Sequence, residues 1–417
     1  MPMVEMPAQR TRQHGIREHR NRLGTRRDVV DLWDGSVSLL REPWPPIRVL
    51  IGDDSAVMRS ELTRMLNSSP QMRVCGSART GEEVVAKAKL LHPDVITLDV
   101  EMPLLNGVEA LKRIMSECPC PVIMFSSATR RGAEVTLEAL SAGAFDYLRR
   151  VSPQPGANAV KLQQDLIEKI EAASHGWIAR KRALLHPLPA PGFPITVQHL
   201  SLRRMPRLTP QIIVVGTSTG GPQALLELLP ELPGDLPVPM IVVQHMPPGF
   251  TAPLAKRLDG LCRVKVCEAQ HGQAVVPGTV YIAPAGQHTT LVRNSKARNS
   301  PANRSQSNHQ YEVSICLSDT PSNTVHKPSV DVTMQSVASV FGDLTLGIIL
   351  TGMGTDGLQG MTAIRDAGGV TMGQDEASSV VYGMPRCCAE HGILQQVMPL
   401  SNVAGHILQA VHYRHKI

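Results

Sequence analysis

The sequence has 417 residues, which is long enough for two or three domains. Its 42% of hydrophobic residues excludes a disordered or collagen-like chain, and its 3% of aromatic residues argues against a base-stacking nucleic-acid platform. No apolar run reaches the length of about 18 residues that a membrane span needs, and the N-terminus lacks a signal-peptide core. We therefore expect a cytoplasmic protein that is not embedded in a membrane.

The formal net charge of +6 comes from one short segment. Residues 10–27 hold seven arginines and one glutamate, so the charges of all other residues sum to zero. A basic arm of this kind can bind RNA or an anionic membrane, but without interleaved aromatic residues it is more typical of a solvated tail. The rest of the chain therefore gives no electrostatic reason to expect a nucleic-acid partner.

The eight cysteines are scattered and form no CxxC pair. No His/Cys spacing suits zinc. They indicate a reducing compartment, without a disulfide framework.

Composition divides the chain into an extension, a first domain, a linker and a second domain. Residues 1–46 are polar, rich in arginine and end in prolines, which predicts a disordered extension. Over residues 47–173, strand-like runs alternate with helical patterns, which predicts an α/β domain with a five-stranded parallel sheet of the flavodoxin-like type. The expected strands are Arg48–Gly52, Met72–Ser77, Val95–Asp99, Val122–Ser126 and Phe145–Leu148. The expected helices are Ser55–Asn67, Gly81–Leu91, Gly107–Glu117, Gly132–Ala142 and Asn158–Ala173.

A proline-rich linker is predicted over residues 174–208, where a basic helical tail is followed by the prolines of His186–Pro194. Residues 209–417 carry a second α/β pattern and predict a doubly wound domain. Within this domain, Arg293–Gln310 is rich in asparagine and serine and predicts a flexible surface loop. The strands expected in this domain are Ile212–Gly216, Met240–Gln244, Val280–Ala283 and Leu346–Leu350.

Carboxylates stand at the ends of two predicted strands of the first domain. Asp53 and Asp54 end the first strand and Asp99 ends the third, and these ends are neighbours in a flavodoxin-like sheet. Three converging carboxylates are costly without a hard cation, so we expect Mg²⁺ there. Ser126 ends the fourth strand and Arg150 follows the fifth, a hydroxyl and a cation suited to holding a phosphoryl group on an aspartate. The alternative is that such aspartates only cap helices, which happens often.

This half of the chain resembles the receiver domain of two-component response regulators. The resemblance is carried by Val49–Ser55, Leu98–Pro103, Asn106-Gly107 and Gly143–Tyr147. It implies that Asp99 accepts a phosphoryl group from a histidine kinase and that Asp53 and Asp54 help to hold Mg²⁺. It also implies that Ser126 is the switch hydroxyl.

One position departs from the receiver pattern. Receivers usually carry a Lys-Pro pair after the fifth strand, where this chain has Arg150 and Val151. A guanidinium is a bulky planar fork, whereas an ammonium is compact, so the exchange is not conservative at a tight site. We expect activation by phosphorylation to be weaker than activation by deletion of residues 1–208 as a result.

In the second domain, Ser218 lies on a glycine-rich turn between a strand and a helix. The helix N-terminus supplies free N–H groups and a favourable field for an anion, which suits acyl transfer through a serine ester. The turn also fits the G-x-S-x-G pattern of α/β-hydrolases, but that fold places its acid before its histidine. A nucleotide loop is disfavoured because its second glycine is missing. A purely structural turn is a further alternative.

His245 ends the next strand, where it can reach Ser218 in a parallel sheet. His326 is the rival histidine, although it falls in a loop. Asp356 follows a buried strand and is the preferred acid, with Asp331 as the alternative. The order Ser…His…Asp differs from the known hydrolase orders, so such a triad would not belong to the α/β-hydrolase fold.

The second domain resembles the methylesterase domain of chemotaxis protein-glutamate methylesterases of the CheB type. The resemblance is carried by Ser218–Pro222, Gln244–Pro247, His326–Asp331, Leu350–Gly357 and Gln374–Pro385. It implies that Ser218 is the nucleophile, His245 the general base and Asp356 its orienting acid. It also implies an oxyanion-hole role for the Met353 backbone N–H. A receiver followed by this domain is the architecture of that family.

The resemblance implies a phosphorylation-regulated serine hydrolase that removes methyl groups from glutamyl methyl esters of chemoreceptors and deamidates their glutamines. It implies Mg²⁺ at the receiver and no cofactor for hydrolysis. Its implied partners are methyl-accepting receptors and a chemotaxis histidine kinase. Two alternatives are a non-catalytic module that binds receptors in response to phosphorylation, and a dinucleotide-binding protein.

Overall fold

The computed structural model describes residues 45–127, 129–150, 157–185, 209–294 and 312–413. The described residues from Pro46 onward form one compact unit. Most of the predicted extension, the proline-rich part of the linker and most of the predicted loop at residues 293–310 lie outside the described residues. None of the helices in the described part combines the length and the apolar character that a membrane crossing requires.

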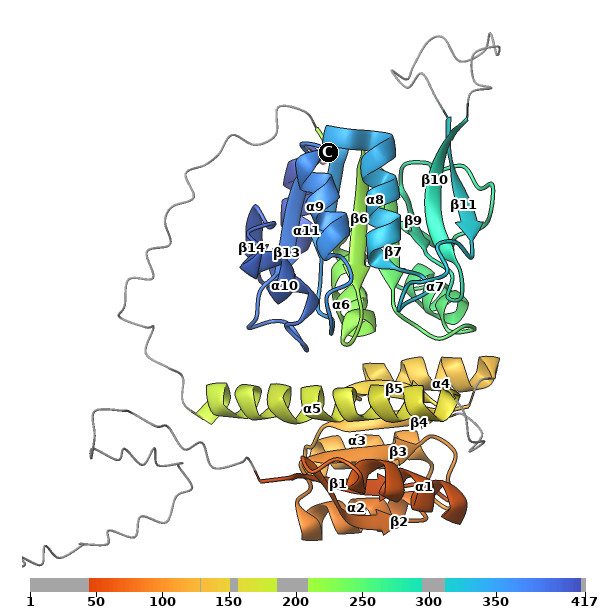
Figure 1. Cartoon of the computed structure of the whole chain (residues 1–417), viewed down its shortest axis with the longest axis vertical. Helices are drawn as coiled ribbons and strands as arrows, with labels where there is room; N and C mark the ends of the chain where they lie inside the picture. The colour runs from red at the N-terminus through yellow and green to blue at the C-terminus, as the bar shows by residue number, and fades with distance from the viewer. Residues whose placement is uncertain (1–44, 128, 151–156, 186–208, 295–311, 414–417) are drawn as a thin grey trace, which may run out of the picture. The chain divides into compact units, whose positions relative to one another are not determined.

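The first domain is a doubly wound α/β domain whose described residues form a five-stranded parallel sheet in the order β2-β1-β3-β4-β5 (Figure 1). The predicted flavodoxin-like sheet is confirmed. The apolar sides of α1 and α5 pack on one face of the sheet, and those of α2, α3 and α4 pack on the other. The elements are β1 (Ile47–Gly52), α1 (Ala56–Asn67), β2 (Met72–Ala78), α2 (Gly81–Leu91), β3 (Val95–Asp99), α3 (Gly107–Glu117), β4 (Val122–Ser126), α4 (Arg130–Ser141), β5 (Asp146–Arg149) and α5 (Ala157–Leu185).

The helices of this domain begin at side-chain caps. The side chains of Ser55, Thr80, Asn106 and Thr129 accept hydrogen bonds from backbone N–H groups in the first turns of α1, α2, α3 and α4. The strand-end aspartates are therefore not the caps of α1 or α3. Several predicted element ends differ from the structure by one or two residues, and the basic helical tail predicted inside the linker is part of α5, which continues to Leu185 before the prolines begin.

The second domain contains, in its described residues, a seven-stranded parallel sheet in the order β14-β13-β12-β6-β7-β9-β8. Helices α8, α9 and α10 cover one face, and α6, α7 and α11 cover the other. An antiparallel pair, β10 and β11, stands outside this sheet. The elements up to that pair are β6 (Ile212–Thr217), α6 (Gly221–Leu228), η1 (Leu229–Glu231), β7 (Met240–Gln244), α7 (Thr251–Asp259), β8 (Lys265–Glu268), β9 (Thr279–Ile282), β10 (His288–Asn294) and β11 (Glu312–Ser318). The remaining elements are α8 (Val330–Phe341), η4 (Gly342–Leu344), β12 (Thr345–Ile349), α9 (Leu358–Asp366), β13 (Val370–Gln374), α10 (Met384–Glu390), β14 (Gln396–Met398) and α11 (Leu400–Ala410).

Strand β6 lies at the centre of this sheet, and the chain moves to one side of it for β7 and to the other for β12. Such a reversal opens a crevice at the carboxyl ends of the strands, which is where open α/β sheets bind ligands. In the first domain the same reversal occurs between β1 and β3. The topology therefore marks one edge of each sheet as the place for chemistry.

Candidate functional site

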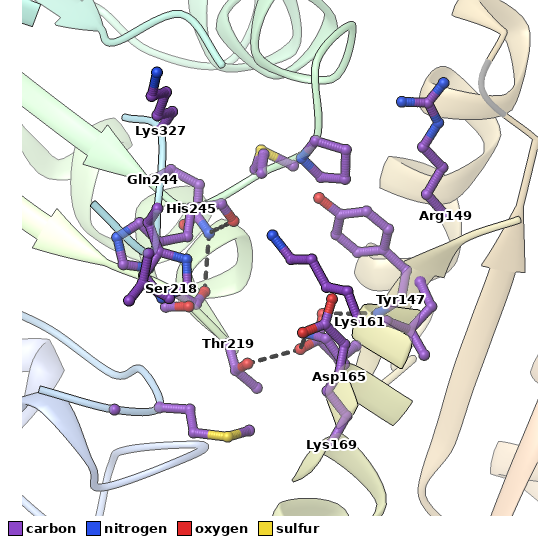
Figure 2. A pocket seen from close by; sticks show the side chains of 18 of the residues that line it. Tyr147, Arg149, Lys161, Asp165, Lys169, Ser218, Thr219, Gln244, His245 and Lys327 are labelled. Carbon is purple, nitrogen blue, oxygen red and sulfur yellow. Dashed lines mark hydrogen bonds and ion pairs between the residues drawn. The ribbon is translucent and has the colours of Figure 1, made fainter. Parts of the chain in front are cut away.

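Ser218 directly follows β6, on the turn that leads into α6. Gly220 makes this turn with φ of +78°, and a Cβ there would lie 2.4 Å from the Cβ of Val380, so only glycine fits. Ser218 is partly exposed and lines a cavity of about 800 Å³ together with His245 and Met353 (Figure 2). A cavity of this size suits a small substrate group or an extended side chain.

His245 directly follows β7, the neighbour of β6 in the sheet. Its backbone N–H donates to Thr217 O at 3.1 Å, which places it beside the turn that carries Ser218. Its Nε2 lies 2.8 Å from Asp356 Oδ2, and only 7% of its side chain is exposed. Within the described residues, its Nδ1 is buried without a hydrogen-bond partner. One ring nitrogen is thus tied to an acid, while the other is available.

Asp356 belongs to the loop before α9, and its carboxylate lies at the N-terminus of helix α8. It accepts hydrogen bonds from Val330 N at 2.8 Å, from Asp331 N at 2.9 Å and from Ser329 Oγ at 3.0 Å. Burial alone would raise the pKa of the Asp356 carboxyl, but the His245 contact and the backbone donors hold that pKa well below its usual range. A carboxylate only accepts hydrogen bonds, so the shared proton belongs to His245 Nε2, which leaves Nδ1 as the nitrogen that presents a lone pair in the neutral form of the ring.

The two rivals from the sequence occupy other places. Asp331 Oδ1 accepts from Gly357 N at 2.9 Å and from Gly360 N at 2.7 Å, so its carboxylate binds the start of α9 and not His245. Burial and the neighbouring Asp356 raise the pKa of Asp331. The ring of His326 stacks on that of His245, with centroids 4.1 Å apart. The structure therefore brings together His245 and Asp356 as the hydrogen-bonded pair.

The loop after β12 passes directly over Ser218. A Cβ at Gly352 would lie 2.9 Å from Ser218 Cβ, so the absence of a side chain there permits the approach. This brings the next residue, Met353, to the wall of the cavity. None of the hydrogen bonds among the described residues uses the Met353 N–H. That donor is available to an oxyanion formed at Ser218.

Residues of the first domain also line this cavity. Thr219 Oγ1 donates to Asp146 Oδ2 at 2.7 Å, and Lys169 of α5 forms an ion pair with the same carboxylate oxygen (Figure 2). Tyr147 stacks on Phe250 with ring centroids 5.1 Å apart. Sequence reasoning missed these contacts because no local pattern links β5 with the serine turn. The position of Thr219 directly after Ser218 was the only available signal.

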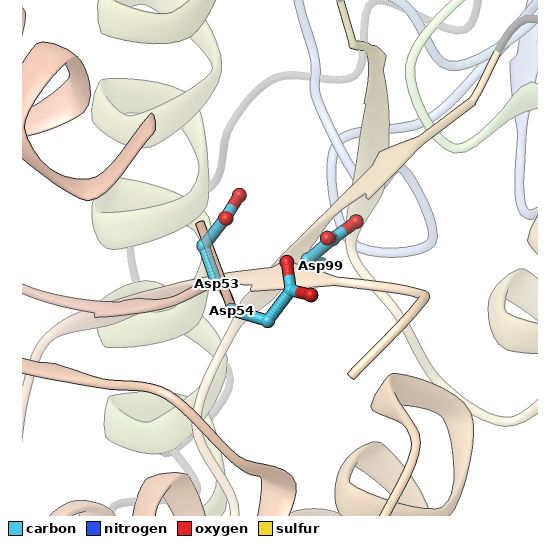
Figure 3. A group of neighbouring side chains, drawn as sticks. All are labelled: Asp53, Asp54 and Asp99. Carbon is cyan, nitrogen blue, oxygen red and sulfur yellow. The ribbon is translucent and has the colours of Figure 1, made fainter. Parts of the chain in front are cut away.

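The second cluster is the group of acids at the edge of the first sheet. Single ligand atoms of Asp53, Asp54 and Asp99 all lie within 4.8 Å of one another (Figure 3). Burial raises the pKa of Asp99 to about 7, and the neighbouring carboxylates act in the same direction. In the described part of the chain, Asp53 Oδ2 is buried without a partner. This oxygen-rich, partly unsatisfied set fits the ligand preference of Mg²⁺.

Arg150 already places a positive charge on these acids. Its Nη1 donates to Asp99 Oδ2 at 2.7 Å and its Nη2 to Asp53 Oδ1 at 2.9 Å, while Asp54 Oδ1 is 3.8 Å away. Ser126 is fully buried, and its Oγ donates to Gly132 O at 3.0 Å in the first turn of α4. The structure therefore brings Arg150 to the acids, whereas the Ser126 hydroxyl is bonded elsewhere.

Comparisons with known proteins match each of the two domains to a family. The family model described as CheB methylesterase matches residues 213–407, and the one described as response regulator receiver domain matches residues 49–155. Three similar relatives carry the name protein-glutamate methylesterase/protein-glutamine glutaminase. That of Desulfitobacterium hafniense is 38% identical over 90% of this chain and 100% of its own length. That of Symbiobacterium thermophilum is 41% identical over 88% and 97%, and that of Bacillus subtilis is 40% identical over 88% and 98%.

Proposed function

Because the chain belongs to the family of CheB methylesterases that carry a receiver domain, we propose that it is a phosphorylation-regulated protein-glutamate methylesterase and protein-glutamine glutaminase. Its substrates are glutamyl methyl esters and glutamines of methyl-accepting chemoreceptors, and its phosphodonor is the histidine kinase of the same pathway. The observation that carries the proposal is the pairing of His245 with Asp356 beside Ser218 at the switch point of the sheet. The reaction is placed in the cytoplasm, because scattered cysteines without CxxC pairs suit a reducing compartment.

The reaction begins with the transfer of the Ser218 hydroxyl proton to His245 Nδ1 while Oγ attacks the ester carbonyl carbon. The oxyanion binds the Met353 N–H, and Asp356 stabilises the imidazolium through Nε2. The imidazolium then returns its proton to the leaving methoxide, so methanol departs and an acyl-serine remains. Water then attacks this ester while His245 Nδ1 takes its proton, and the imidazolium returns that proton to Ser218 Oγ, which frees the glutamate and Ser218. A glutamine follows the same route and releases ammonia.

Control is exerted at Asp99, the proposed phosphoacceptor. Mg²⁺ held by Asp53, Asp54 and Asp99 would offset the charge of the carboxylates and of the incoming phosphoryl group. Arg150 binds the same acids, and Ser126 would have to leave its α4 bond to reach the phosphoryl group. The hydrogen bond from Thr219 to Asp146 links the receiver to the serine turn, which supports coupling between the two domains.

The experiment measures methanol release from membranes that contain methylated receptors. Ser218→Ala is expected to lower the rate at least 10³-fold, because the residual rate then comes from binding and oxyanion stabilisation alone. Ser401→Ala, an exposed serine on α11, serves as the matched control. Retention of more than about a tenth of the activity would remove Ser218 from the mechanism. Receptor binding by the wild-type protein without any methanol release would identify a non-catalytic module instead.

A second measurement tests the regulation. Acyl phosphate with Mg²⁺ is expected to raise the activity of the full-length protein, and Asp99→Asn is expected to remove this response because asparagine forms no acyl phosphate. An unchanged response in Asp99→Asn would show that another group accepts the phosphoryl.

A further inference from the structure

His326 covers one face of the His245 ring. The two imidazole rings are 4.1 Å apart between centroids and inclined by 17°, which is a stacked arrangement. His326 lines the same cavity as Ser218. The reaction scheme gives this ring no part, although it touches the residue that must move the proton.

The ring of His245 needs a second restraint. Its side chain makes one hydrogen bond in the described structure, from Nε2 to Asp356, and a ring held at one atom can still pivot about that bond. A pivot of this kind would turn Nδ1 away from Ser218. A flat ring stacked at van der Waals distance blocks the pivot, because any tilt of His245 would collide with it.

The same loop also holds the acid. Ser329 follows His326 by three residues and donates its hydroxyl to Asp356 Oδ1 at 3.0 Å. The loop from His326 to Ser329 therefore restrains the imidazole through its first residue and the carboxylate through its last. A restraint shared by both partners keeps their relative position constant during turnover.

His326 can stack on His245 during the reaction only if it does not repel the positive charge that His245 acquires. Burial, followed by the charge of His245, lowers the pKa of His326 to about 4, although Asp356 opposes this shift. Lys161 and Lys169 act in the same direction as His245. His326 is thus neutral at neutral pH and does not repel the imidazolium that His245 forms.

We propose that His326 is a positioning residue whose neutral ring, stacked on His245, holds Nδ1 of the general base toward Ser218. The inference rests on the proposed hydrolase function. It requires a flat ring at position 326, and it does not require that this ring carry a proton.

The test compares full-length His326→Ala, His326→Leu and His326→Phe with the wild-type protein. We expect kcat for methanol release to fall about 10- to 100-fold in the alanine variant and several-fold in the leucine variant, with KM within about twofold. The phenylalanine variant should keep at least half of the wild-type kcat, because its ring can stack but cannot transfer a proton. Its pH profile of kcat/KM should keep the wild-type shape.

His391→Ala and His391→Phe, at an exposed histidine after α10, are the matched controls and should behave as wild type. A phenylalanine variant as slow as the alanine variant, or with a shifted pH profile, would overturn the proposal in favour of a proton relay. Alanine and leucine variants with wild-type kcat would overturn it as well. If alanine at this position prevents folding, the comparison of leucine with phenylalanine decides.

The rate of Ser218 labelling by a fluorophosphonate probe should follow the same order among the variants. This readout needs no receptor, so it separates the two proposals. A wild-type protein that is labelled but releases no methanol would contradict the substrate assignment and still test His326.

Discussion

The two sheets of this protein place carboxylates at the same kind of edge, but they hold them in opposite ways. In the second domain, Asp356 has four hydrogen-bond donors, and its pKa is held low. In the first domain, one oxygen of Asp53 has no partner among the described residues, and the pKa of Asp99 is raised to about 7. A carboxylate whose oxygens all accept hydrogen bonds is suited to stay ionised and fixed in place. An undersatisfied cluster is built to take up a ligand.

The difference also appears in how each edge obtains its positive charge. Asp356 faces backbone N–H groups at the start of α8, which cannot leave without unfolding the helix. The charge of the acids in the first domain is offset in part by Arg150, a long side chain that is 26% exposed. The edge of the second sheet is therefore preorganised for a repeated reaction. At the edge of the first sheet, the arginine can be replaced by another cation.

The largest expected effect concerns the fixed edge. Asp356→Asn should lower kcat by about 10³- to 10⁴-fold, because asparagine favours the wrong tautomer of His245. Asp331→Asn should lower it much less, since the asparagine oxygen can still accept from Gly357 and Gly360. Methanol-release kinetics provide the measurement. The reverse ranking would show that Asp331 is the orienting acid.

The ligand-binding edge should respond to pH near neutrality. With the pKa of Asp99 at about 7, the protonated carboxyl competes with Mg²⁺ below this pH, and the competition disappears above it. Mg²⁺ affinity is therefore expected to rise by about tenfold between pH 6 and pH 8. Isothermal titration calorimetry at several pH values measures this change. A flat affinity over this interval would mean that Asp99 is already ionised at pH 6.

A smaller effect is expected at Ser329, one of the donors that hold Asp356. Ser329→Ala removes the bond to Asp356 Oδ1 and the cap on Val332 N. We expect kcat to fall about three- to tenfold and the free energy of unfolding to fall by about 1 kcal/mol. Ser336→Ala is the control, because this serine lies on the same helix and bonds to Leu291 instead. An equal loss of kcat in both variants would assign the effect to helix α8 as a whole.

The smallest expected effect comes from exchanging Arg150, the cation beside the acids of the first domain. Arg150→Lys should raise Mg²⁺ affinity by about threefold. Mg²⁺ has to displace two hydrogen bonds of the guanidinium from Asp99 and Asp53, whereas it would have to displace only a single contact of a lysine ammonium. Arg149→Lys, at an exposed position in β5, is the matched control. Isothermal titration calorimetry at fixed pH measures the Mg²⁺ affinity of both variants and of the wild-type protein. Unchanged or weaker binding in Arg150→Lys would show that Arg150 does not compete with the metal.

Most of the strand pattern could be read from the sequence because apolar runs of β-branched residues ended in polar side chains at the sites. Val95–Asp99 and Met240–Gln244 have the predicted bounds. Five strands of the second domain were not predicted, namely β8, β10, β11, β13 and β14. Of these, β8 and β14 are short, only partly apolar, and lie at the two edges of the sheet. The basic residues after Ala173 show no apolar period, so the sequence pattern did not separate this part of α5 from the linker.

The acid cluster of the first domain could be predicted from the sequence more completely than the site around Ser218. Asp53, Asp54 and Asp99 could be grouped because each directly ends a strand. The choice between Asp356 and Asp331 rested on the position after a buried strand, and the contacts that separate the two acids depend on how α8 packs against α9. The stacking of His326 had no sequence signal beyond its motif, because the path of a loop is set by tertiary packing.

Asp356 and Asp331 also tie a pair of helices together. Asp356, just before α9, binds the first N–H groups of α8, and Asp331, in the first turn of α8, binds Gly357 and Gly360 at the start of α9. The helices cross closely, since a Cβ on Gly360 would lie 2.5 Å from Met334 Cβ. Each helix is thus completed by a side chain from the other, and they form one cooperative unit. Heat inactivation of the hydrolase should therefore coincide with the melting of this helix pair, with no intermediate in which the domain is folded but the acid is misplaced.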